Sequence, residues 1–150
     1  MFGKKLSEYV RFVNWILVLV AVVFVIRLIL PMAGVQIAQA RWVSINLVLL
    51  VGLIYCSVAV HTSGFGSYKQ LFGLVLIQNL FAHWLIALGI LLGIVTGRPN
   101  IYTAPEFFGG NNGANWFHVL AHAIAAPLVS VIAWLFGSVI LFVTKRLVRA

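Results

Sequence analysis

The sequence is poor in charge, and this scarcity sets the class of the protein. Only 8% of its 150 residues are charged and 63% are hydrophobic, with a mean hydropathy of +1.12. Soluble domains carry about a quarter charged residues, because their surfaces must be hydrated. Helices satisfy their own backbone hydrogen bonds in lipid. The composition therefore predicts an all-α polytopic membrane protein.

Most of the charged residues are basic, because the sequence has ten Lys and Arg and only two acidic residues, Glu8 and Glu106. The basic residues flank the apolar runs, which is typical of anchoring at the membrane surface, and nucleic-acid binding is rejected. A single cysteine, Cys56, excludes an intramolecular disulfide. Neither a Ser-His-Asp, a Cys-His nor a paired-carboxylate pattern is present, so enzymatic activity is the least favoured function.

Four apolar runs predict one four-helix transmembrane domain. They cover residues 9–30, 42–60, 71–95 and 115–143. Each is close to or above the roughly 20 residues that span hydrocarbon. The first is expected to end at Pro31, which breaks the hydrogen-bond ladder. The loop 98–114, rich in Gly, Asn and aromatic residues, is expected to fold back as a lid, or to be an ordered loop without function.

The distribution of positive charge predicts the orientation in a cytoplasmic (inner) membrane, because cytoplasmic loops hold an excess of Lys and Arg. With both termini inside, the cytoplasmic set is Lys4, Lys5, Arg11, Lys69, Lys145, Arg146 and Arg149, against Arg27, Arg41 and Arg98 outside. Both termini are therefore expected in the cytoplasm.

Histidines within the runs are the main candidates for chemistry, since polar groups in lipid are costly and tend to face a helix or cavity. Asn79 and His83 lie four residues apart on one face of the third helix. The small residues Ala82, Gly89 and Gly93 form a separate strip, where a helix or a flat cofactor could approach. Ordinary helix packing around a hydrogen-bonded histidine is the alternative.

On the fourth helix His118 and His122 also lie four residues apart and share a face. Such a pair can chelate a metal or supply axial ligands, although satisfied interfacial histidines are equally compatible. Pro127, which follows the pair, is expected to bend the helix and open a cavity.

Two cofactor sites follow from these histidines. In the first, His83 and His122 share a b-type haem. An expected difference of roughly 9 Å between their depths in the membrane counts against this site. In the second, Glu106 joins His118 and His122 to hold zinc, iron or copper.

Arg27 suggests a different class of function, because no carboxylate within the runs balances it. Facing the bundle, it would line an anion or polar-solute path with Asn14, Asn46 and Asn79. Facing outward, it would reach the lipid headgroups.

Three functions therefore remain open. The first is a non-catalytic cofactor- or metal-binding subunit, carrying b-type haem or a transition metal in electron transfer. The second is a small homo-oligomeric channel or transporter, and the third is a structural subunit of a larger membrane complex. The expected partners are the lipid bilayer and either further copies or other membrane subunits. Four-helix b-type cytochromes resemble this chain in helix count and membrane histidines, and this resemblance assigns no residue.

Overall fold

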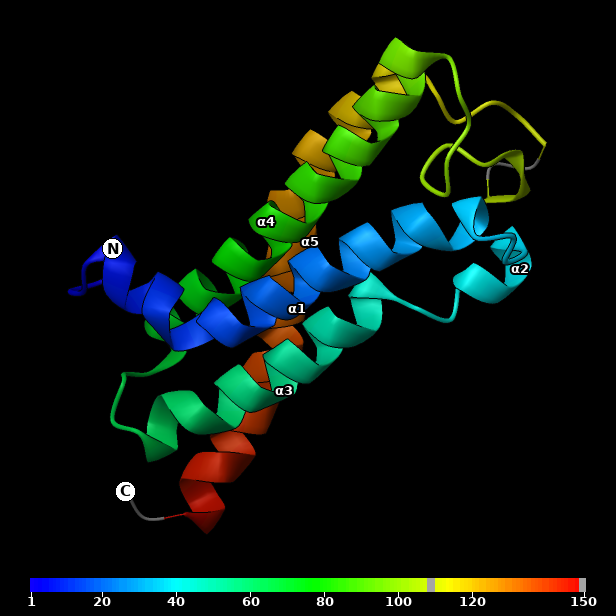
Figure 1. Ribbon diagram of the computed structural model, residues 1–150. Helices are drawn as coiled ribbons and strands as arrows, with labels where there is room; N and C mark the ends of the chain where they lie inside the picture. Colours follow the sequence, from blue (N-terminus) through cyan, green and yellow to red (C-terminus); the bar gives the residue numbers. More distant parts are fainter. Residues whose placement is uncertain (108–109, 149–150) are drawn as a thin grey trace.

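The computed structural model describes residues 1–107 and 110–148, and four long helices dominate it (Figure 1). They are α1 (Leu6–Met32), α3 (Ile45–Thr62), α4 (Tyr68–Thr96) and α5 (Trp116–Leu147), with a short α2 (Ile37–Ala40) and a 3₁₀ turn η1 (Pro105–Phe107) between them. All four are long and apolar enough to cross a membrane. The predicted fold class, an all-α bundle of four membrane-spanning helices, is confirmed.

The end of α1 differs from the prediction, because the helix continues through Pro31 to Met32. A proline in the last turn removes only its own backbone donor, so the following amides still find partners. The amides of Gly34 and Val35 donate to the carbonyls of Pro31 and Leu30 at 3.1 and 3.0 Å. Gly34 has a φ of +83°. This left-handed glycine, with its two return bonds, ends the helix.

Helix α5 begins after Asn115, whose side chain accepts a hydrogen bond from one of the first amides of the helix. The side chain of Asn115 accepts a hydrogen bond from the amide of His118 at 2.8 Å. Because His118 and His122 both follow this capped start of α5, the cap sets their positions along the helix. Pro127 lies inside α5, and the bend expected there stays a prediction.

The segment before α1, the end of α5 and the turn between α3 and α4 lie together at one end of the bundle. The side chain of Gln70 donates to the carbonyl of Phe2 at 2.8 Å, and Lys145 donates to the Ser67 hydroxyl at 2.6 Å. The opposite end holds the ends of α1 and α4 and the starts of α3 and α5. We call it the loop end, because the segment 97–115 lies there. Arg149, counted in the predicted orientation, lies outside the described residues.

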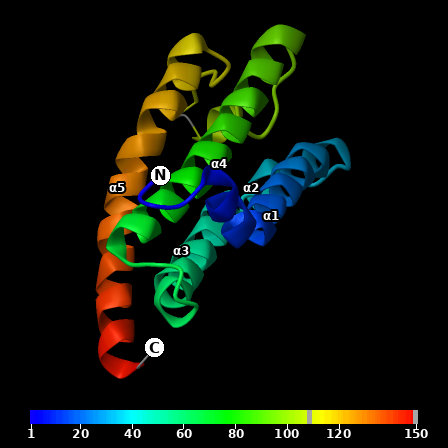
Figure 2. The same ribbon diagram turned by 90° about the vertical axis from the view of Figure 1, so that its left-hand side faces the viewer.

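The helices form two pairs that diverge toward the loop end. Toward that end α4 and α5 run side by side, α1 and α3 lie on the other side of the opening, and the separation is visible in two perpendicular views (Figures 1 and 2). Elsewhere α1 packs against α4, and α3 packs against α5. The segment between α4 and α5 turns back into this opening. Its residues 101–104 are buried, at 0–6% exposure. The predicted folding back of the loop is thus present, and its role as a lid stays a prediction.

Candidate functional site

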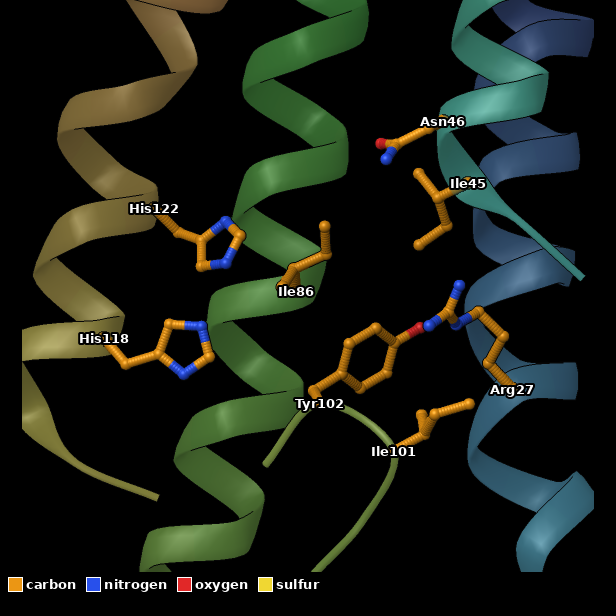
Figure 3. Close-up of a pocket in the computed structure, with 8 residues that line it drawn as sticks. All are labelled: Arg27, Ile45, Asn46, Ile86, Ile101, Tyr102, His118 and His122. Carbon is orange, nitrogen blue, oxygen red and sulfur yellow. The ribbon is translucent and has the colours of Figure 1, made fainter. Parts of the chain in front are cut away.

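A cavity of about 180 Å³ lies in the opening between the two helix pairs. Its walls come from α1, α3, α4, α5 and the 97–115 segment. The lining residues are Arg27, Ile45, Asn46, Ile86, Ile101, Tyr102, His118 and His122. Figure 3 shows the two imidazoles approaching from α5 and the guanidinium approaching from α1 on the far side. The cavity therefore brings basic side chains from distant parts of the sequence to one space.

Arg27 is half-buried, and its guanidinium lines the cavity. Its Nη1 donates to the carbonyl of Val43 at 3.0 Å, and its guanidinium lies 5.4 Å from the centre of the Tyr102 ring. Its Nε is buried and has no hydrogen-bond partner among the described residues. The two acids, Glu8 and Glu106, are both absent from the cavity lining. The positive charge of Arg27 is thus held at the cavity without a carboxylate beside it.

Tyr102 forms the wall of the cavity beside Arg27. Its ring stacks on Phe24 of α1, with the ring centres 5.2 Å apart, and its hydroxyl donates to the Phe24 carbonyl at 3.4 Å. Burial raises the pKa of Tyr102 to about 12, although the nearby Arg27 opposes this shift. The phenol therefore stays protonated at neutral pH and keeps its ability to donate a hydrogen bond.

The small-residue strip of α4 receives the loop. A Cβ at Gly89 would lie 2.5 Å from Cδ2 of Tyr102, and one at Gly93 would lie 2.8 Å from Cγ2 of Thr103. The Asn100 side chain also donates to the Gly89 carbonyl at 2.7 Å. The strip was expected to admit a helix or a flat cofactor, and instead it seats these loop side chains.

Three histidines from two helices lie in one row beside the cavity. The Nδ1 atoms of His83 and His122 are 3.0 Å apart, and their ring centres are separated by 5.1 Å. The ring of His118 follows at 5.0 Å from that of His122, and its Nδ1 lies 2.9 Å from the Gly113 carbonyl. The depth difference expected between His83 and His122 is therefore wrong, because α4 and α5 do not align at their midpoints.

The predicted site with Glu106 is not assembled in the structure. Glu106 is exposed in η1. Within residues 1–107 and 110–148, no three or more His, Cys, Asp and Glu side chains are arranged to hold a metal ion. The short 3₁₀ turn that carries Glu106 belongs to the loop, and its carboxylate does not join the row of histidines.

A second cavity of about 870 Å³ adjoins the first and is almost entirely apolar. It is a groove between α3 and α5, with α4 as its floor. Asn79 and Gln78 lie in that floor, and Asn46 lines both the groove and the basic cavity. Of the predicted polar path, Arg27, Asn46 and Asn79 thus line adjoining spaces. Asn14 lines neither of them and is exposed on α1.

No family model, curated protein or solved structure matches the chain. The site must therefore be interpreted from its own chemistry.

Tyr102 is the main site residue that the sequence analysis missed, together with three isoleucines of the cavity wall. A loop aromatic gives no local sign that it will be buried. The indirect sign was the pair Gly89 and Gly93, because glycines one turn apart on a membrane helix leave room for whatever packs there.

Breaking the contact between His83 and His122 should give a measurable coupling energy. We expect His83→Leu and His122→Leu each to destabilise the protein, and the double variant to lose less than the sum. Interhelical hydrogen bonds in membranes contribute about 0.6 kcal/mol on average and up to about 1.7 kcal/mol. Thermal unfolding of the four proteins in detergent measures the coupling.

His61 provides the control, because it lies at the opposite end of the bundle, where its Nε2 is 3.0 Å from the Val148 carbonyl. Combined with His83→Leu, His61→Leu should give additive losses. Additive losses for the His83 and His122 variants would contradict a direct interaction between these two rings.

Proposed function

We infer that the protein is a non-catalytic, membrane-embedded binding protein whose basic cavity takes an anionic group. The observation that carries this proposal is Arg27, whose guanidinium lines the cavity with a buried Nε that lacks a hydrogen-bond partner among the described residues. A buried charge is costly unless it is paired, and the chain supplies no carboxylate to this cavity. An anion from outside the chain would complete the site.

The other walls suit the same ligand. The imidazoles of His118 and His122 and the amide of Asn46 carry groups able to donate a hydrogen bond, while the Tyr102 hydroxyl donates to the Phe24 carbonyl. Donors directed at a carboxylate or phosphate, with an arginine among them, form strong charge-assisted hydrogen bonds.

The test compares a short anion with its neutral counterpart. Butanoate should raise the unfolding temperature of the purified full chain in uncharged detergent, because a ligand that binds the folded state stabilises it. Butanamide should have a smaller effect. Arg27→Gln should weaken butanoate binding by about tenfold or more, since a hydrogen bond to a charged group is worth about 1.5–3 kcal/mol.

Arg98 gives the matched control, because it is an exposed arginine in the same loop-end region and does not line the cavity. Arg98→Gln should keep the full response to butanoate. An equal response of Arg27→Gln and the unchanged protein, or an equal effect of butanamide, would overturn the proposal.

A second candidate function is metal binding at His83 and His122, whose Nδ1 atoms are close enough to hold an ion in place of their hydrogen bond. Two nitrogens on a tetrahedral ion, with bonds of about 2.1 Å, lie about 3.4 Å apart. The observed 3.0 Å is close to this value. Axial ligands on opposite sides of one iron would need about 4 Å, on bonds of about 2 Å. The geometry thus favours a small ion over the b-type haem.

Elemental analysis and an absorption spectrum of the purified protein test this candidate together with electron transfer. A bound ion should be lost in His83→Ala and His122→Ala and kept in His61→Ala. A metal-free, colourless preparation would contradict both the metal-ion and the haem hypotheses.

The proposed setting is the cytoplasmic membrane with both termini inside. The charge distribution supports it, because the end of the bundle that holds both termini also carries most of the basic residues. The loop end and its cavity would then face the outside.

A further inference from the structure

The groove beside the basic cavity indicates what the rest of the ligand is. We propose that the protein binds an anionic amphiphile from the membrane, with its head in the cavity and a single apolar chain in the groove between α3 and α5. This inference rests on the proposed function, since the head would be the anion that Arg27 binds.

The basic cavity is continuous with the apolar groove. Asn46 lines both, so the cavity and the groove meet at this residue near the start of α3. Beyond it the groove is walled by aliphatic and aromatic side chains, such as Leu50 and Ile54 on α3 and Ile132 and Phe136 on α5. A ligand that entered from the lipid could therefore place a charged head and an apolar chain at the same time.

The two spaces also differ in size. The head cavity has about 180 Å³ and the groove about 870 Å³, which suits a compact carboxylate or phosphate head on a longer apolar chain. The α5 wall of the groove runs from Val129 to Ile140, or about 16 Å at 1.5 Å per residue. This is about half of the 30 Å hydrocarbon core, the length that one lipid chain fills.

The walls of the groove are exposed. Leu50, Ile54, Ile132 and Phe136 are 47–66% exposed, so the groove is open along its side. Its floor carries the buried residues Val75, Gln78 and Asn79 of α4. A chain could therefore enter between the two walls directly from the bilayer, without passing through water.

Photolabelling of the full chain in phosphatidylcholine nanodiscs tests the inference. The probe is palmitate that carries a diazirine near its methyl end. We expect the label on the α3 and α5 walls of the groove, and less label from the corresponding palmitamide. Ala133→Phe, which fills the groove, should reduce labelling severalfold.

Two further variants make the result specific. Ala123→Phe adds the same bulk to an exposed α5 position that does not line the groove, so it should leave labelling unchanged. Leu50→Trp obstructs the groove from an exposed position that tolerates a larger side chain, and it should reduce labelling even where Ala133→Phe folds poorly.

The outcomes separate this inference from the proposed function. If butanoate binding depends on Arg27 but palmitate labelling is unchanged in both Ala133→Phe and Leu50→Trp, the groove assignment is wrong and the anion site stands. If butanoate binding is independent of Arg27, the proposed function fails. Labelling spread evenly over the outer faces of the helices would also contradict binding of the apolar chain in the groove.

Discussion

Replacing Gly52 with leucine should destabilise the bundle by about 1–3 kcal/mol, because it overpacks the point where three helices meet. A Cβ at this position would overlap the side-chain oxygen of Gln78 on α4 and approach Cγ2 of Ile16 on α1 to 3.0 Å. Gln78 cannot move without loss, since its Nε2 donates to Cys56 Sγ at 3.3 Å and to the Leu74 carbonyl at 3.2 Å. The new side chain must therefore separate α3 from its neighbours.

Val51 supplies the control for this experiment. It precedes Gly52 on α3 and is 47% exposed, so Val51→Leu adds bulk toward the surroundings of the helix. Thermal unfolding in detergent should show a large loss for Gly52→Leu and almost none for Val51→Leu. Equal unfolding temperatures for the two variants would contradict the close approach of the three helices.

Gly89→Leu should have a comparable cost and a more local result, namely displacement of the loop from the opening between the helix pairs. Its Cβ would lie 2.5 Å from Cδ2 of Tyr102, whose ring is fixed by Phe24 on the other side. Because neither helix can yield easily, Tyr102 must leave its place. We expect a loss of about 1–3 kcal/mol and faster chymotrypsin cleavage after Tyr102, which is buried when the loop is in place.

Leu88→Met is the matched change, because Leu88 is the neighbouring residue and is 46% exposed. It should preserve both the unfolding temperature and the resistance to chymotrypsin. Gly89→Leu should also weaken butanoate binding, since Tyr102 lines the cavity. An unchanged cleavage rate in Gly89→Leu would show that the loop does not depend on this contact.

Sequence reasoning located the helices well, because the signal for them is local. Each apolar run became a helix that begins and ends within a few residues of the prediction. The main difference is at Pro31, where the left-handed Gly34 ends the helix and the proline does not. Asn115 before α5 and Gly97 after α4 mark helix ends, where any membrane helix must find partners for its unpaired backbone groups.

The site was predictable only in its parts. Arg27, Asn46, His118 and His122 were singled out because polar groups in a membrane span are costly. They were assigned to separate schemes, and the structure brings them to one cavity. The expected depth difference between His83 and His122 failed for a related reason, since counting residues from helix midpoints assumes that neighbouring helices are level.

The sequence by itself determined that this protein is a bundle of four membrane-spanning helices with few charges, because lipid imposes apolar surfaces and internally satisfied backbones on any chain that crosses it. Only the tertiary structure decided which polar groups meet. That depends on helix rotation, on the divergence of the two pairs and on Tyr102 entering the gap beside Gly89. These features arise from packing between residues far apart in the chain, which no local pattern encodes.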